Sequence, residues 1–152
     1  MDIVLVFNKA TLTKSVETLL WKYSNTIEGA DNFKQVSNVR TDTVGDNADI
    51  RVLLDSFVKR TKHLASIMHE FVIGDATEDV NSHNVTIPIR VSGTWGGHES
   101  VLKSHLDSYV INGMMADWLS VTSPNEATIY IANMKIDEDN IISELYAVGG
   151  AI

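Results

Sequence analysis

The chain has 152 residues, a length that suits one hydrophobic core, so residues 1–152 are expected to form a single domain. Its 44% hydrophobic and 21% charged residues are ordinary for a globular protein and unlike a disordered one. A net charge of −8 disfavours nucleic acid and anionic membranes as partners. The lack of cysteine excludes disulfides, thiolate metal sites and thiol nucleophiles, and it fits folding in a reducing cytoplasm.

The N-terminal stretch is apolar but too short, and too acidic at its start, to be a signal peptide. No run elsewhere approaches the ~20 apolar residues that span a bilayer, so neither targeting nor membrane insertion is expected. β-Branched and aromatic side chains over Ile3–Phe7 predict a short strand or an extended arm. Apolar residues spaced by three and four then predict a helix from about Thr11 to Thr26. Residues 29–49 are polar and lack a clear period, which predicts a long surface loop.

The middle of the chain contains the clearest helical pattern, a single apolar stripe from Ile50 to Phe71. Asp75–Asn84 is predicted to be an acidic connector. Val85–Val91 alternates between apolar and polar residues, which is the period of a half-buried strand. Because Pro88 has no N–H to give to a ladder, this strand is expected at a sheet edge or paired on one side only.

The last third of the chain begins with a glycine-rich turn, Gly93–Gly97. Apolar residues from Val101 to Leu119 cover more than half of a helical circumference, which predicts a central, mostly buried helix. Ser123, followed by proline and an acid, predicts the capped start of another helix. Asp137 is a candidate cap for a further segment, so a kink or break is expected near residue 136.

These elements define the expected fold class as mainly α (α+β). We expect a helical bundle of about four helices with a short two-stranded β element or a β arm.

Histidine supplies the neutral-pH acid–base candidates, and the chain has five. His69 and Glu70 begin like a zinc-protease helix, but Ile73 occupies the position of the required second histidine. His98 and His105 stand two helical turns apart with Asp107 nearby, so their imidazoles can share one face. A partly exposed helix surface is the simpler interpretation of this pair.

Two other segments have incomplete binding patterns. Residues 75–81 alternate like the early ligands of a calcium loop, but valine and threonine occupy the positions that need glycine and a bidentate glutamate. The turn Gly93–Gly97 precedes a helix, yet it lacks the lysine and the spacing of a phosphate loop. A solvated acidic loop and a flexible turn are the simpler interpretations. No catalytic, cofactor-binding or metal-binding residue is assigned, and no cofactor is expected.

The aromatic residues divide into two groups. Trp21, Trp118 and Tyr109 fall on apolar helical faces, where core packing is expected. Trp95 lies in the glycine turn away from any stripe, so it either covers the core from outside or anchors a partner.

A family resemblance rests on His105–Asn112, Ala116–Leu119, Thr122–Ala127 and Tyr130. These segments place a tyrosine, a hydrophobic pair and an asparagine before a tryptophan near a helix end, then a capped helix with an acid, an alanine and a tyrosine. The pattern resembles small structural proteins encoded in the virion-assembly modules of tailed bacteriophages and prophages of gut bacteria. It covers roughly the C-terminal half of the chain, together with the strand at Val85–Val91.

The resemblance implies a non-enzymatic subunit of the neck or tail of a virion, such as a head-to-tail connector or a tail completion protein, assembled in the host cytoplasm. Its expected partners are copies of itself, as a homo-oligomer, and neighbouring virion subunits. The expected interface residues come from the two strands and the glycine turn, where unpaired edges and exposed aromatic groups favour contacts: Ile3, Leu5, Phe7, Ile87, Ile89 and Trp95.

Two other functional classes stay open. In one, the chain is a stand-alone cytosolic binding or adaptor module, in which Trp95 and the acidic connector meet a basic partner. In the other, it is a metal-dependent hydrolase whose histidines are gathered from distant helices, because such a site needs no local motif.

Overall fold

The computed structural model describes residues 1–26 and 48–148. In chain order it contains β1 (Asp2–Phe7), α1 (Lys9–Thr26), α3 (Ala48–Ile67), β2 (Thr77–Glu78), β3 (Val85–Arg90), α4 (Glu99–Thr122) and α5 (Pro124–Leu145). The loop predicted at residues 29–49 lies almost wholly outside the described residues.

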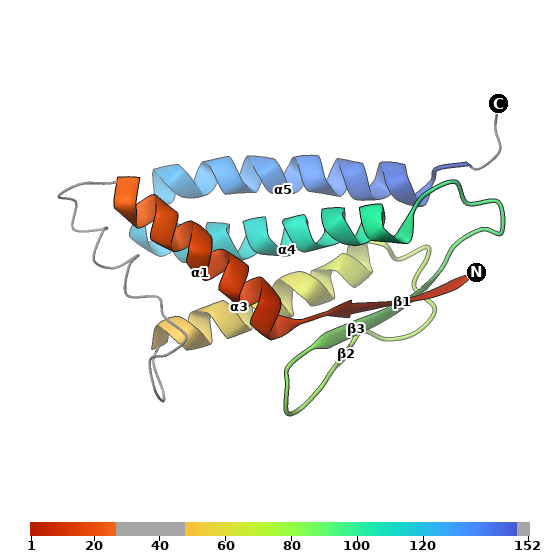
Figure 1. Cartoon of the computed structure of the whole chain (residues 1–152), viewed down its shortest axis with the longest axis horizontal. Coiled ribbons are helices and arrows are strands. Elements are labelled where there is room, and N and C mark those ends of the chain that lie inside the picture. Colours follow the sequence, from red (N-terminus) through yellow and green to blue (C-terminus); the bar gives the residue numbers. More distant parts are fainter. Residues whose placement is uncertain (27–47, 149–152) are drawn as a thin grey trace.

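The described part of the chain is mainly helical, with α4 at its centre. Figure 1 shows α4 and α5 side by side along the long axis, α1 crossing α4, and the small sheet on the side away from α5. α4 packs against α1, α3, α5 and β1. Leu102, Leu106, Val110, Met114 and Leu119 on this helix are fully buried. The prediction of a central helix is confirmed.

The sheet is antiparallel and three-stranded, in the order β1-β3-β2. The α+β class and the helical bundle are as expected, but the sheet has one strand more than the two predicted. β2 lies inside the predicted connector Asp75–Asn84 and pairs at Thr77 and Glu78 with β3. A strand of two polar residues has no alternating pattern, so no periodicity in the sequence indicates it.

β3 is the middle strand of the sheet, so its expected position at an edge was wrong. It tolerates Pro88 because of the direction in which that residue's backbone faces. The carbonyl of Pro88 accepts a hydrogen bond from the Ile73 N–H at 3.0 Å, on the side away from β1. The N–H and C=O groups of a strand residue point to the same side, so the missing N–H of Pro88 also faces away from β1 and removes no bond between β1 and β3. On the other side of β3, β2 ends before it reaches this level of the sheet.

Two helix boundaries also differ from the sequence prediction. α3 ends at Ile67, and Phe71 belongs to the turn that follows, where its N–H donates to the carbonyl of Met68 at 2.8 Å. α5 continues through residue 136 to Leu145 without a break. Asp137 does not cap a new helix, because its carboxylate is buried and bonded to α4.

Candidate functional site

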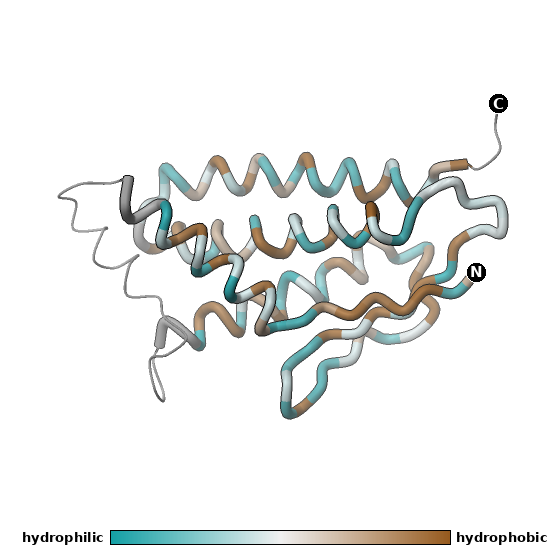
Figure 2. Tube along the Cα trace, in the orientation of Figure 1, coloured by the Kyte–Doolittle hydropathy of each residue, from teal (hydrophilic) through white to brown (hydrophobic). Residues whose placement is uncertain are grey.

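Five of the six predicted interface residues lie in the core. Figure 2 shows β1 as an almost continuous hydrophobic path. The side chains of Ile3, Leu5, Phe7, Ile87 and Ile89 are at most 4% exposed. The sheet turns them toward the helices, so they are not available for contact with a neighbouring subunit. That part of the interface prediction was wrong.

The sixth predicted residue, Trp95, fastens the end of α5. Its indole N–H donates to the Glu144 carbonyl at 2.8 Å, and its ring is half-buried against the core. The neighbouring Gly96 N–H donates to Ala147 at 2.9 Å, and the His98 N–H donates to the Glu144 carboxylate at 2.7 Å. Glycine-rich turns before helices can bind anions, and the anion bound at the start of α4 is the carboxylate of Glu144 from the same chain. Trp95 covers the core from outside.

The outer face of β1 is exposed instead. Val4 is 61% and Val6 48% exposed, and the paired residue on β3 opposite Val4 is the half-buried Pro88. Asp2, at the start of the strand, accepts hydrogen bonds from the Arg90 guanidinium at 2.7 and 3.2 Å. β1 is also an edge of the sheet. One short strand thus presents an apolar outer face together with a backbone edge that is unpaired within residues 1–26 and 48–148.

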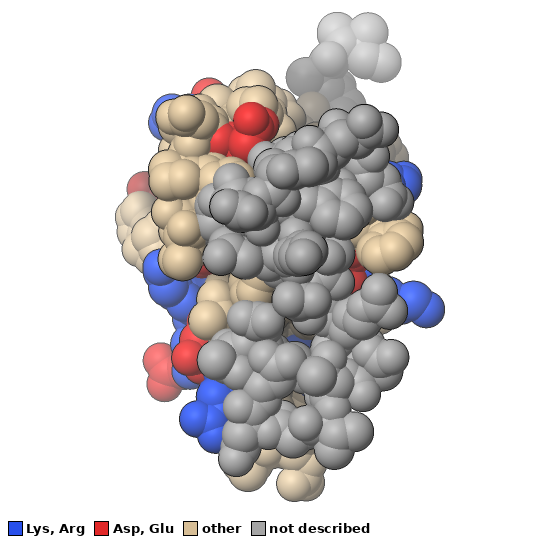
Figure 3. Space-filling model, turned by 90° about the vertical axis from the view of Figure 1, so that its left-hand side faces the viewer, with Lys and Arg blue, Asp and Glu red and all other residues tan. Residues whose placement is uncertain are grey.

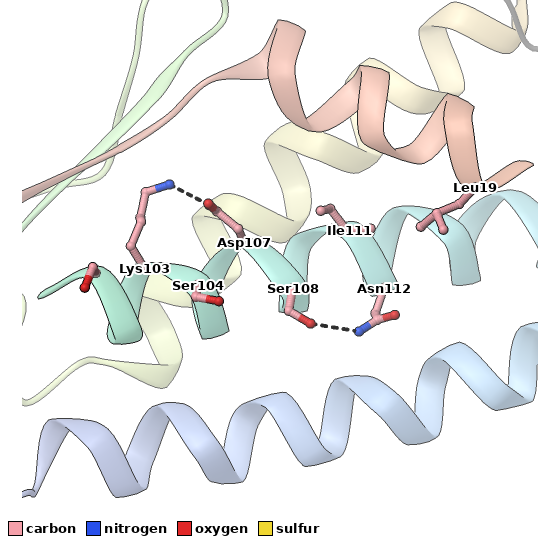
Figure 4. A pocket seen from close by; sticks show the side chains of 8 residues that line it. Leu19, Lys103, Ser104, Asp107, Ser108, Ile111 and Asn112 are labelled. Carbon is pink, nitrogen blue, oxygen red and sulfur yellow. Dashed lines mark hydrogen bonds and ion pairs between the residues drawn. The ribbon is translucent and has the colours of Figure 1, made fainter. Parts of the chain in front are cut away.

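A shallow polar groove of about 650 Å³ runs along α4 (Figure 4). Its lining residues come from α4 and, in the case of Leu19, from the middle of α1: Leu19, Ser100, Lys103, Ser104, Asp107, Ser108, Ile111 and Asn112. Ser108 donates to both carboxylate oxygens of Asp137 at 3.0 Å, and Asn112 donates to one of them at 2.7 Å. The buried carboxylate therefore joins α5 to α4, and it occupies Ser108 and Asn112 of the groove lining.

A second polar cluster joins α3 to α4. The Arg60 guanidinium donates to both oxygens of Asp117, and the Ser56 hydroxyl donates to one of them at 2.5 Å. Gly113 leaves room for this arginine, because a β carbon there would lie 2.7 Å from the Arg60 side chain. Burial opposes ionisation of Asp117, but the hydrogen bonds from Arg60 and Ser56 outweigh it and lower its pKa.

The histidines are spread over the molecule. His63 stacks on Tyr109, and His69 lies in the turn after α3. His83 is joined through its Nδ1 atom to the Glu78 carboxylate at 3.0 Å in the β2–β3 hairpin. His98 is exposed before α4, and His105 is half-buried on it. Within residues 1–26 and 48–148, no group of three or more histidine, aspartate or glutamate side chains could hold a metal ion.

The acidic residues of the predicted connector stabilise a turn. One carboxylate oxygen of Asp79 accepts the backbone N–H groups of Asn81 and Ser82 at 2.9 and 2.8 Å. These backbone hydrogen bonds lower the pKa of Asp79, and the bond from Ser82 has a larger effect than the bond from Asn81. The alternation that resembles a calcium loop is therefore explained by a hairpin turn.

Charged side chains of both signs are interspersed on the visible part of the described surface in Figure 3, with neutral residues between them. None of the helices in the described ranges is long and apolar enough to cross a membrane.

Comparison of the chain with known protein families, with curated proteins and with solved structures found no match.

The sequence predicted that Ile3–Phe7 forms a strand, but not which of its side chains face outward. Ile3–Phe7 is apolar at every position, so its own sequence carries no alternation that separates the inner from the outer face. Only the register with β3, which sets Leu5 opposite the buried Ile87, settles that Val4 and Val6 face outward. The tryptophans were partly misplaced as well: Trp118 is buried as expected, but Trp21 is 49% exposed.

Proposed function

We propose that this protein is a structural subunit that works by packing against copies of itself and against neighbouring subunits. Within that class, we propose a place at the neck or tail of a tailed-phage virion, in line with the resemblance of residues 105–130 to small virion-assembly proteins. In this role the protein forms contacts that hold neighbouring subunits together, and it catalyses no reaction.

One observation carries the proposal: β1 combines exposed apolar side chains with a strand edge that no other described strand pairs with. Such an edge is a template for pairing with another chain, and proteins that stay monomeric usually protect it with a charge, a proline, a bulge or a covering element. The outward residues Val4 and Val6 supply none of these. A surface of this kind suits a subunit that meets another chain in its working state.

The mass of the purified protein, measured by light scattering over a range of concentrations, tests the proposal. We expect oligomers that dissociate on dilution. A monomer at every concentration would contradict self-association and favour the stand-alone adaptor class. Deletion of residues 1–7 is unsuitable as a test of assembly, because it also removes Ile3, Leu5 and Phe7 from the core.

A further inference from the structure

We propose that β1 pairs antiparallel with β1 of a second copy, so that two three-stranded sheets join into one across a twofold axis. This inference rests on the proposed function, because it names the contact through which copies associate.

The direction of the backbone groups on β1 supports this pairing. The Met1 amino group donates to the Val91 carbonyl and the Val91 N–H donates to the Met1 carbonyl, both at 3.0 Å. Because backbone groups alternate along an antiparallel ladder, the odd-numbered residues of β1 face β3. The N–H and C=O groups of Asp2, Val4 and Val6 therefore point to the free edge.

The lengths of the two sheet edges favour β1 of a second copy as the occupant. The opposite edge of the described sheet, β2, has two residues, and its Glu78 already meets Lys62 and His83. A head-to-tail continuation of the sheet from β1 onto β2 would thus form a very short ladder. A second β1 offers six residues of matching length.

Apolar complementarity favours the antiparallel arrangement. The start of the strand has no net negative charge, because Asp2 is already paired with Arg90 and lies beside the Met1 amino group. An antiparallel copy places Val4 of each strand opposite Val6 of the other, so that the exposed apolar side chains cover one another. With the axis between Val4 and Val6, the outer valines of both copies form one apolar strip next to Pro88. Such a contact is isologous and closes as a dimer.

Single cysteines test the contact directly, because the natural chain has no cysteine to compete. Val4→Cys and Val6→Cys are each expected to give short-bismaleimide-linked dimers, and a mixture of the two variants is expected to give a disulfide-linked dimer, because Val4 lies opposite Val6 of the second copy. Val80→Cys is the matched control, since Val80 is 86% exposed but lies in the β2–β3 hairpin. Equal cross-linking of all three variants, or none at Val4 and Val6 in a protein that light scattering shows to be dimeric, would overturn the inference.

A charge on the outer face separates this inference from the proposed function. Val6→Lys is expected to raise the dimer dissociation constant at least about tenfold, because it places two charges beside the new ladder. Its unfolding curve should match that of Val80→Lys, which leaves association unchanged. If the wild type associates and Val6→Lys associates equally well, the strand contact is wrong and the proposed function stands. If the wild type never associates, both are wrong.

Discussion

The ring of Trp95 packs directly against the backbone of Gly97. A β carbon at Gly97 would lie 2.4 Å from the Trp95 ring, far inside normal contact distance, whereas one at Gly93 would meet nothing within 4 Å. Gly97→Ala is therefore expected to displace the ring from its bond with Glu144 and to cost about 1–3 kcal/mol of unfolding free energy. Urea denaturation measures this loss. Gly93→Ala is the control, and equal losses in the two variants would contradict the packing described for Trp95.

Asp117 links the stability of the protein to pH. Its pKa is lowered in the folded state, because the bonds from Arg60 and Ser56 outweigh the effect of burial. The stabilisation is therefore present above the unfolded-state pKa of about 3.9, and it is lost as the pH falls through the folded-state value. Unfolding free energies measured from neutral pH downward should show this loss.

Asp117→Asn removes the titrating group. The variant is expected to be less stable than the wild type at neutral pH and to lose less stability in acid. Asp55→Asn, an exposed position on the same helix as Arg60, serves as the control and should follow the wild-type curve. An unchanged acid dependence in Asp117→Asn would assign the effect to other carboxylates.

At the scale of elements, α5 is held along its length by α4. Asp137, on the buried side of α5, accepts hydrogen bonds from Ser108 and Asn112, whereas Asp139 is exposed and meets only Lys135 among the contacts of the described residues. Asp137→Ala leaves two half-buried donors without an acceptor and is expected to cost about 1–3 kcal/mol. Asp139→Ala should change the unfolding free energy by less than about 0.5 kcal/mol. Similar values in both variants would contradict the bridging role of Asp137.

The helices and β3 were accessible from sequence because each has a sustained apolar period, and β1 was accessible because its residues are β-branched and aromatic. α1 and α5 begin close to the predicted positions, and α4 is central as its broad apolar surface indicated. The break expected near residue 136 failed because Asp137 has a tertiary role: an acid within a helix suggests a cap when its partners on another helix are unknown. The prediction that the strand containing Pro88 lies at a sheet edge failed for a similar reason. Whether a proline fits a middle strand depends on which neighbouring strand its backbone faces, and that is set by tertiary structure.

At the scale of the whole molecule, the candidate site is a property of strand pairing. The apolar side chains that first suggested an interface at Ile3, Leu5 and Phe7 build the core, and the adjacent Val4 and Val6 reach the surface. Which set faces outward depends on contacts between residues more than 80 positions apart, such as Ile3 with Ile89. No local pattern carries that information. The resulting surface is short and apolar, and its backbone groups are directed outward.

Residue-resolved hydrogen exchange at low and high protein concentration tests the central claim most directly, because it reports on the backbone of β1 itself. The amides of Ile3 and Leu5 bond to β3 and should exchange slowly at both concentrations. Those of Val4 and Val6 should exchange rapidly in dilute solution and become protected as the chains associate. If the Val4 and Val6 amides exchange equally fast at a concentration where the protein is oligomeric, β1 is not the contact between copies.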